Sequence, residues 1–193
     1  MKIIFIITLV GAFVNVSLSQ NVQKFDYESL VGTESPNFNG RTLSGKDFDF
    51  IDKKGKNIML VFWSKYCGGC NKEQPDLNRI IEEMKGNNFE LISVIDESTY
   101  ELTNSDTTKY SLRIYPVNSG FYEYNRPIFY NKKINYEIIT EGKSIRQKFG
   151  LPNSSPIILF IDESLRVIDY SRAYYIYNNY EHLKEKLDFL MHF

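Results

Sequence analysis

Two cysteines separated by two glycines are the residues of this sequence whose type and spacing could do chemistry. Cys67 and Cys70 are the only cysteines among the 193 residues. A short apolar run ends just before them and a segment with helical spacing follows, so Cys67 is expected at the start of a helix. The unpaired N–H groups at a helix start favour the thiolate over the thiol. We therefore expect Cys67 to attack a disulfide of another protein and Cys70 to resolve the mixed disulfide.

Three other roles for the pair stay open on the residue pattern alone. As a purely structural disulfide the pair would contribute little, because closing a four-residue loop is worth about 2 kcal/mol, against about 3 for fifteen residues. A metal site would need two further ligands, and His182 and His192 lack the spacing of a second ligand pair. Inert buried thiols also fit the spacing. The export signal described below argues against them, because exported proteins meet an oxidising compartment in which paired thiols react. Redox chemistry is the role that the pattern favours.

The segments around the cysteines predict a strand, a helix and a second strand. Residues 57–63 form a continuous apolar run, which is typical of a strand buried on both faces. Residues 71–85 carry apolar side chains at helical spacing and end before Gly86. Residues 89–95 form a second apolar run, and such a unit builds parallel strands through a right-handed crossover. The remaining predictions are short strands within 37–52, strands at 157–161 and 166–171, and helices at 141–149 and 180–193.

The segment 96–141 has no clean period and is rich in Tyr and Phe. We expect an irregular insertion there. Two roles stay open for its aromatic part, residues 110–136: a flap that completes the apolar core, or a surface on which client proteins dock.

The first residues have the pattern of an export signal. One lysine precedes about a dozen mostly apolar residues, and small residues stand at positions 17 and 19. This pattern predicts a signal peptide over residues 1–19, with cleavage after Ser19. A retained membrane anchor is the alternative, although the apolar run is shorter than the roughly 20 residues that span a bilayer. We expect residues 20–193 to form one exported domain, in the periplasm or cell envelope.

Composition and charge exclude other classes of function. Apolar residues make up 42% and charged residues 24% of the chain, as in an ordinary globular protein. Lys and Arg number 23 against 24 for Asp and Glu, which leaves a net charge of −1. No basic field is present that would hold nucleic acid, so we expect no nucleic-acid partner.

Two separated motifs resemble those of the TlpA/ResA-like thioredoxin-fold family, which are exported bacterial thiol–disulfide oxidoreductases of the AhpC/TSA-redoxin superfamily. The first is Trp-x-x-x-Cys-x-x-Cys-x-x-Glu-x-Pro, matched at Trp63, Cys67, Cys70, Glu73 and Pro75. The second resembles the family's segment around a cis-proline, and it runs through Phe149-Gly150-Leu151, Ser155-Pro156 and the apolar residues 159–161. Residues 35–38 and 55–57 resemble the family's entry into the domain.

The resemblance implies an α/β protein with a thioredoxin fold, in which helices flank a central mixed β-sheet. It gives Cys67 the role of nucleophile and Cys70 that of resolving thiol. Pro156 would follow a cis peptide bond and face the disulfide, and the backbone of Ser155 would pair with a bound client. Glu73 would exchange protons with Cys70; a solvated charge on the helix face is the alternative.

The client would also meet the residues around the two sulfurs. We assign Trp63, Tyr66, Gly68 and Gly69 to this surface together with Ser155. Gly69 stands where the family often has a proline, and Tyr66 stands where it has a tryptophan.

The resemblance implies no bound cofactor and no metal, because the dithiol is itself the redox group. The partners would be exported proteins that contain disulfides and a membrane-bound electron donor. One alternative is a peroxiredoxin-like peroxidase, for which Ser64 is suitably placed, but Leu60 stands where that motif needs a proline. A copper-binding assembly protein that uses Cys67 and Cys70 is the non-enzymatic alternative.

Overall fold

The computed structural model describes residues 25–64, 67–96, 113–114, 128–129, 136–172 and 179–192. The expected signal peptide, Tyr66 and most of the aromatic segment 110–136 lie outside the described residues. No helix within the described ranges is long and apolar enough to cross a membrane.

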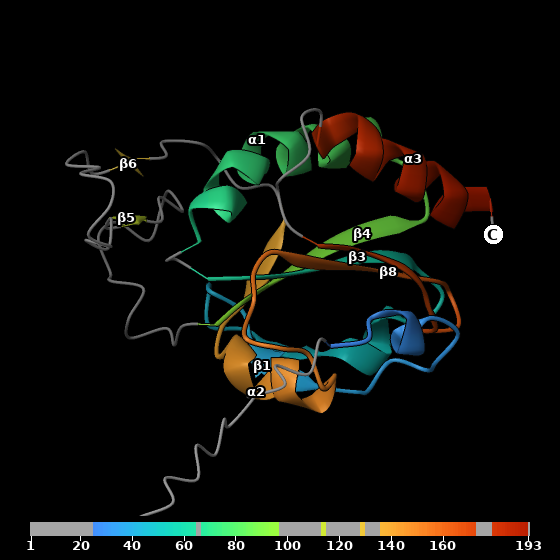
Figure 1. The fold of residues 1–193 in the computed structure, drawn as a ribbon, viewed down its shortest axis with the longest axis horizontal. Coiled ribbons are helices and arrows are strands. Elements are labelled where there is room, and N and C mark those ends of the chain that lie inside the picture. The colour runs from blue at the N-terminus through green and yellow to red at the C-terminus, as the bar shows by residue number, and fades with distance from the viewer. Residues whose placement is uncertain are drawn as a thin grey trace, which may run out of the picture.

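A mixed five-stranded sheet forms the centre of the molecule (Figure 1), with the strand order β7-β4-β3-β8-β9. Neighbours β3, β4 and β7 run parallel, whereas β8 is antiparallel to both β3 and β9. The bounds of the strands are Asn57–Trp63 for β3, Phe89–Ile95 for β4, Glu137–Ile139 for β7, Ile157–Ile161 for β8 and Val167–Arg172 for β9.

Helices cover both faces of this sheet. The helices α1 (Gly68–Glu83) and α3 (Asn179–His192) lie together on one face (Figure 1). The short helix α2 (Gly142–Lys148) lies on the other face. It shares that face with the hairpin of β1 (Asn39–Arg41) and β2 (Asp47–Asp49) and with the 3-10 helices η1 (Glu28–Leu30) and η2 (Phe50–Lys53).

Strand β3 is buried along its whole length because both of its faces meet a core. Successive side chains of a strand point to opposite faces. Ile58, Leu60 and Phe62 accordingly join the core under α2, while Met59 and Val61 join the core under α1 and α3. The apolar run at residues 57–63 is thus continuous because the strand lies between two layers of helices and both of its faces are buried.

Most predicted elements are confirmed. The strands at 57–63, 89–95 and 157–161 have the expected bounds, and 166–171 pairs with β8 as β9, shifted by one residue. Helices α2 and α3 also differ from expectation by one residue at each end, which is the usual uncertainty of helix ends. Helix α1 begins at Gly68, three residues before the predicted start, because Cys67 is its N-cap.

The segment 96–141 is not irregular at its end. Strand β7 pairs in parallel with β4 and forms one edge strand of the sheet. Its three residues are too few to show a period of two, so no sequence pattern marks them. The two-residue strands β5 (Arg113–Ile114) and β6 (Ile128–Phe129) pair with each other in a separate antiparallel ladder.

Candidate active site

The two cysteines form a disulfide at the start of α1. Cys67 is the N-cap residue with an extended backbone, and its Sγ accepts a hydrogen bond from the N–H of Cys70 at 3.1 Å. The N–H of Cys67 in turn donates to the carbonyl oxygen of Ser64 at 3.0 Å, which links the cap of α1 to the residue that follows β3. The sulfur of Cys67 therefore lies where the helix presents its unpaired N–H groups.

The two sulfurs differ in their access to solvent. Cys67 is half-buried, whereas Cys70 is 2% exposed. Between the two cysteines lie Gly68 and Gly69, which are the first two residues of α1. The more accessible of the two side chains is therefore the one at the helix cap.

Trp63 packs against the disulfide from the last position of β3. Its side chain is 1% exposed, and its indole N–H donates a hydrogen bond to the hydroxyl of buried Ser93 on β4. An indole N–H needs such a partner when it is buried. The apolar cluster around it consists of Cys70, Ile95 and Ile138, with Leu43, Cys67 and Tyr136 packed at its margin.

Glu73 is buried, which contradicts the alternative of a solvated charge. It lies on α1 three residues after Cys70, so both side chains project from the same face of the helix. Only 2% of Glu73 is exposed. The carboxyl group of Glu73 is therefore enclosed in the protein on the same side of α1 as Cys70.

The peptide bond between Ser155 and Pro156 is cis, as the resemblance implied. Strand β8 begins at the next residue, and its Ile157 lies opposite Phe62 in the register with β3. The loop that contains Ser155 and Pro156 is therefore next to the end of β3, from which the chain continues to Cys67.

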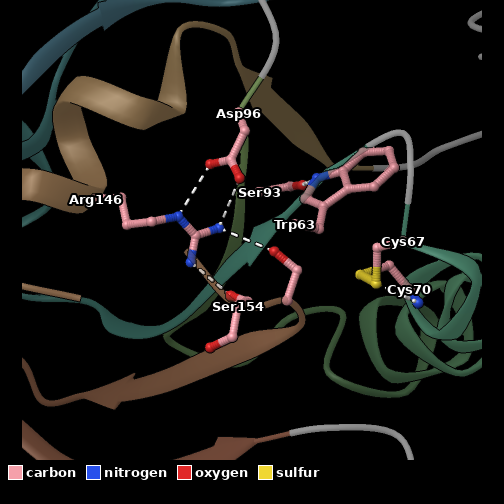
Figure 2. The surroundings of a disulfide bond; sticks show 8 residues. Trp63, Cys67, Cys70, Ser93, Asp96, Arg146 and Ser154 are labelled. Carbon is pink, nitrogen blue, oxygen red and sulfur yellow. Dashed lines mark hydrogen bonds and ion pairs between the residues drawn. A yellow bond between two sulfur atoms is a disulfide. The ribbon is translucent and has the colours of Figure 1, made fainter. Parts of the chain in front are cut away.

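A buried arginine that the sequence analysis missed holds this loop. Arg146 of α2 is 1% exposed, and its guanidinium binds both carboxylate oxygens of Asp96 at 3.1 Å each. The same group donates to the Ser155 hydroxyl at 3.0 Å and to the carbonyl oxygens of Pro152 and Ser154 at 3.1 and 2.8 Å. Figure 2 shows the guanidinium facing Asp96, with Trp63 between this pair and the disulfide.

A second side chain reaches the loop from the N-terminal part of the domain. The hydroxyls of Tyr27 and Ser154 are 3.2 Å apart, and the Tyr27 ring stacks on Tyr170 of β9 with centroids 5.3 Å apart. The guanidinium of Arg172 also lies over the Tyr27 ring, 4.7 Å from its centroid. The loop before Pro156 is thus held from two elements that are far apart in the sequence.

A cavity of about 170 Å³ lies beside the cluster around Trp63. Three of its lining residues are shared with that cluster: Ile138 belongs to it, and Leu43 and Tyr136 pack against it. The others come from the turn between β1 and β2 and from β7: Thr42, Ser44, Lys46 and Glu137. Among the described residues, no group of three or more His, Cys, Asp or Glu side chains is placed to hold a metal ion.

Comparison with known proteins places these features in a family. Residues 31–170 match the model of the AhpC/TSA family. Over 116 residues the chain is 31% identical to the thiol-disulfide oxidoreductase ResA of Bacillus cereus. That match covers 60% of this chain and 66% of ResA, which is just under two thirds of the relative's length.

Solved structures show the same fold. A putative thiol:disulfide interchange protein DsbE from Chlorobium tepidum matches with a TM-score of 0.60 at 15% identity, covering 83% of this chain and 97% of that one. A secreted disulfide oxidoreductase from Mycobacterium tuberculosis matches with a TM-score of 0.55 at 18% identity, covering 79% and 96%. The chain has a thioredoxin fold, and the resemblance to ResA-like redoxins is confirmed. By the extent of the family match, the chain belongs to the AhpC/TSA family.

Proposed function

We propose that the protein is an exported thiol–disulfide oxidoreductase, which reduces or exchanges disulfides in other exported proteins. The observation that carries this proposal is the Cys67–Cys70 disulfide at the start of α1, with Cys67 half-buried and Cys70 enclosed. The similarity to ResA, which is named a thiol-disulfide oxidoreductase, supports the same chemistry.

In the proposed reaction the reduced pair transfers two electrons to the client. The Cys67 thiolate attacks one sulfur of the client disulfide, that bond breaks, and the other client sulfur leaves as a thiolate. Cys70 then loses its proton and attacks Cys67 in the mixed disulfide. This step forms the Cys67–Cys70 bond and releases the second client thiol. A membrane-bound donor would restore the dithiol by supplying two electrons.

Glu73 is the proposed acceptor of the Cys70 proton. Both residues are 2% exposed, so bulk water is a poor base for this thiol. The carboxyl group lies on the same face of α1 as Cys70, which belongs to the apolar cluster around Trp63. A buried carboxylate can take the proton and stay neutral until the client leaves.

The client would bind over the exposed sulfur. Its backbone would pair with that of Ser155 by strand addition, next to Pro156, while Tyr66 and the glycines at 68 and 69 would border the attacked bond. Trp63, also expected at this surface from the sequence, is 1% exposed and would support the site from within the core instead of meeting the client. The signal pattern at residues 1–19 supports export, as does the likeness to a structure titled as a secreted oxidoreductase.

The test is disulfide reduction by the purified, prereduced protein, with a disulfide-containing model protein as substrate. Cys67→Ser should abolish the release of client thiols, since the attacking atom is gone. Circular dichroism of the variant would establish that the fold is kept. Exchange at the wild-type rate in Cys67→Ser would refute the proposed mechanism.

Equilibration against a thiol buffer then decides the direction of electron flow. A reduction potential near that of thioredoxin, about −270 mV, identifies a reductant that must be supplied with electrons. A potential of about −120 to −180 mV identifies an oxidant or isomerase.

A further inference from the structure

We propose that Arg146 is a positioning residue for client binding, which fixes the loop of residues 152–155 relative to the end of β3 that leads to Cys67. The inference rests on the proposed function and adds a residue that neither motif contains. Arg146 contacts neither sulfur nor the client, and it would act through the loop that it holds.

Every donor of the guanidinium is used. An arginine side chain has five N–H donors in a fixed plane. Two of them bind the carboxylate of Asp96 in a bidentate pair, at 3.1 Å each. The other three bind the loop through the Ser155 hydroxyl at 3.0 Å and the carbonyl oxygens of Pro152 and Ser154 at 3.1 and 2.8 Å. A planar group with all donors engaged leaves the loop little freedom to shift relative to Asp96.

Asp96 connects this group to the other half of the active site. It directly follows β4, and its N–H donates to the carbonyl oxygen of Trp63 at 3.0 Å. Trp63 is the last residue of β3 and packs against the disulfide. The guanidinium of Arg146 therefore joins the ends of β3 and β4 to the loop of residues 152–155 (Figure 2).

The burial of the pair indicates a role in geometry more than in net stability. Arg146 is 1% exposed and the Asp96 side chain 14%. A buried ion pair is often no more stabilising than apolar residues of the same size, because both ions are desolvated. What apolar residues would not provide is the directional set of bonds to the loop backbone.

The consequence for function is a separation between sulfur chemistry and client binding. A client that pairs with the Ser155 backbone needs that loop at a fixed distance from Cys67. A misplacement of about 1 Å can cost about 100-fold in rate. A small disulfide reagent has no backbone to pair with Ser155, so it is less sensitive to the loop.

The experiment compares Arg146→Met with the double variant Arg146→Met/Asp96→Asn, in the full chain. The single variant leaves the Asp96 carboxylate buried without its partner, so a loss of stability is expected there. The double variant removes both charges and should recover the melting temperature. We expect both variants to raise KM for a peptide with one disulfide by about 10- to 100-fold. The rate with a small aromatic disulfide reagent should fall much less.

Two further variants test specificity. Arg146→Lys keeps the charge but lacks the planar fork, so it should fail to restore the peptide KM. Arg166→Met is the matched control, because Arg166 also donates to a backbone carbonyl, that of Gly32 at 2.8 Å. Arg166 follows the C-terminal end of β8, whereas the loop of residues 152–155 precedes its N-terminal end. It should keep the wild-type peptide KM.

The possible contradictions are distinct. A wild-type KM in the double variant, or equal losses with peptide and small reagent, would overturn the positioning role alone. A wild-type protein that reduces no peptide disulfide would overturn the proposed function and this inference with it.

Discussion

The backbone N–H of Cys70 donates to the sulfur of Cys67 at 3.1 Å. Cys70 is thus bound to Cys67 through the disulfide and also donates a backbone hydrogen bond to the Cys67 sulfur. The first turn of α1 fixes this donor in place. Since the donor belongs to the backbone, it stays in place when the Cys70 side chain is changed. A thiolate at Cys67 would receive the same hydrogen bond.

Replacing Cys70 should therefore stop the reaction halfway. In Cys70→Ser the attacking sulfur and its backbone donor remain, but no thiol is present to resolve the mixed disulfide. We expect a covalent adduct of the variant with its client, which mass spectrometry detects and a reducing agent releases. Cys67→Ser is the matched control and should form no such adduct. Equal adduct formation by both variants would contradict the assigned order of attack.

Replacing Glu73 with glutamine should slow the resolving step at neutral pH. The loss should be about 100-fold or more if Glu73 is the general base for Cys70. It should shrink as the pH rises above about 8.5, where a thiol loses its proton unaided. Single-turnover kinetics from about pH 6 to about pH 10 brackets that thiol value and measures the profile.

Glu82 offers the control for that experiment. It lies on the same helix but is exposed. Glu82→Gln should keep the wild-type pH profile. Parallel profiles for the Glu73 and Glu82 variants would remove the proton-exchange role.

Gly142→Ala should destabilise the protein through overpacking. A Cβ at this position would lie 2.7 Å from the carbonyl oxygen of Ile95 and 2.7 Å from a methyl carbon of Val94. The first turn of α2 would have to move away from β4, at a cost of about 1–3 kcal/mol in unfolding free energy. Urea unfolding measures the loss. Lys143→Ala, at the next and exposed position, should change stability little; a comparable loss there would indicate general damage to the helix.

The contact between α1 and α3 should make stability depend on pH in acid. Hydrogen bonds from Tyr180 and then Arg79 lower the pKa of Glu83 below its ordinary 4.5. Because the pKa of Glu83 is lower in the folded than in the unfolded protein, its carboxylate stabilises the fold at pH values above the unfolded pKa of 4.5. This contribution is lost as the pH falls through the folded pKa. Tyr180→Phe should therefore flatten the decline of melting temperature in acid. Glu185→Gln, an exposed position of α3, should keep that decline.

The same hydrogen bond has the opposite effect on the tyrosine. The hydrogen bond that Tyr180 donates to Glu83 is the main cause that raises the pKa of Tyr180 above its ordinary 10.0, and desolvation is the second cause. A raised folded pKa gives a contribution that is present below pH 10.0 and lost as the pH rises through the folded value. The wild type should therefore lose stability in strong alkali more than Tyr180→Phe does. An unchanged alkaline limb in the variant would show that this bond is absent in solution.

The sequence predicted the centre of the fold because its signals are local. The runs at 57–63, 89–95 and 157–161 are largely apolar, and each is a strand buried between two helix layers. Cys67 and Cys70 carry their chemistry in a spacing of three, which a single helical turn brings together. These features need no knowledge of distant contacts.

The parts that escaped prediction depend on long-range contacts. Arg146 acts through Asp96, 50 positions earlier in the chain, and nothing near either residue announces the pair. The one available signal was weak: Arg146 lies four residues after Gly142 and three before Phe149, on the face of α2 that is buried. Strand β7 was missed because its three residues are defined by pairing with β4.

The position of Trp63 gives the protein a built-in optical signal. Trp63 is the only tryptophan of the chain, and its apolar cluster contains Cys70 and has Cys67 packed at its margin. All indole fluorescence therefore originates beside the bond that the proposed reaction makes and breaks. Making or breaking that bond changes the surroundings of the indole, so the oxidised and reduced forms should differ in emission without any added dye. The unmodified protein can then report each turnover in a stopped-flow instrument, with every residue of the site in its native form.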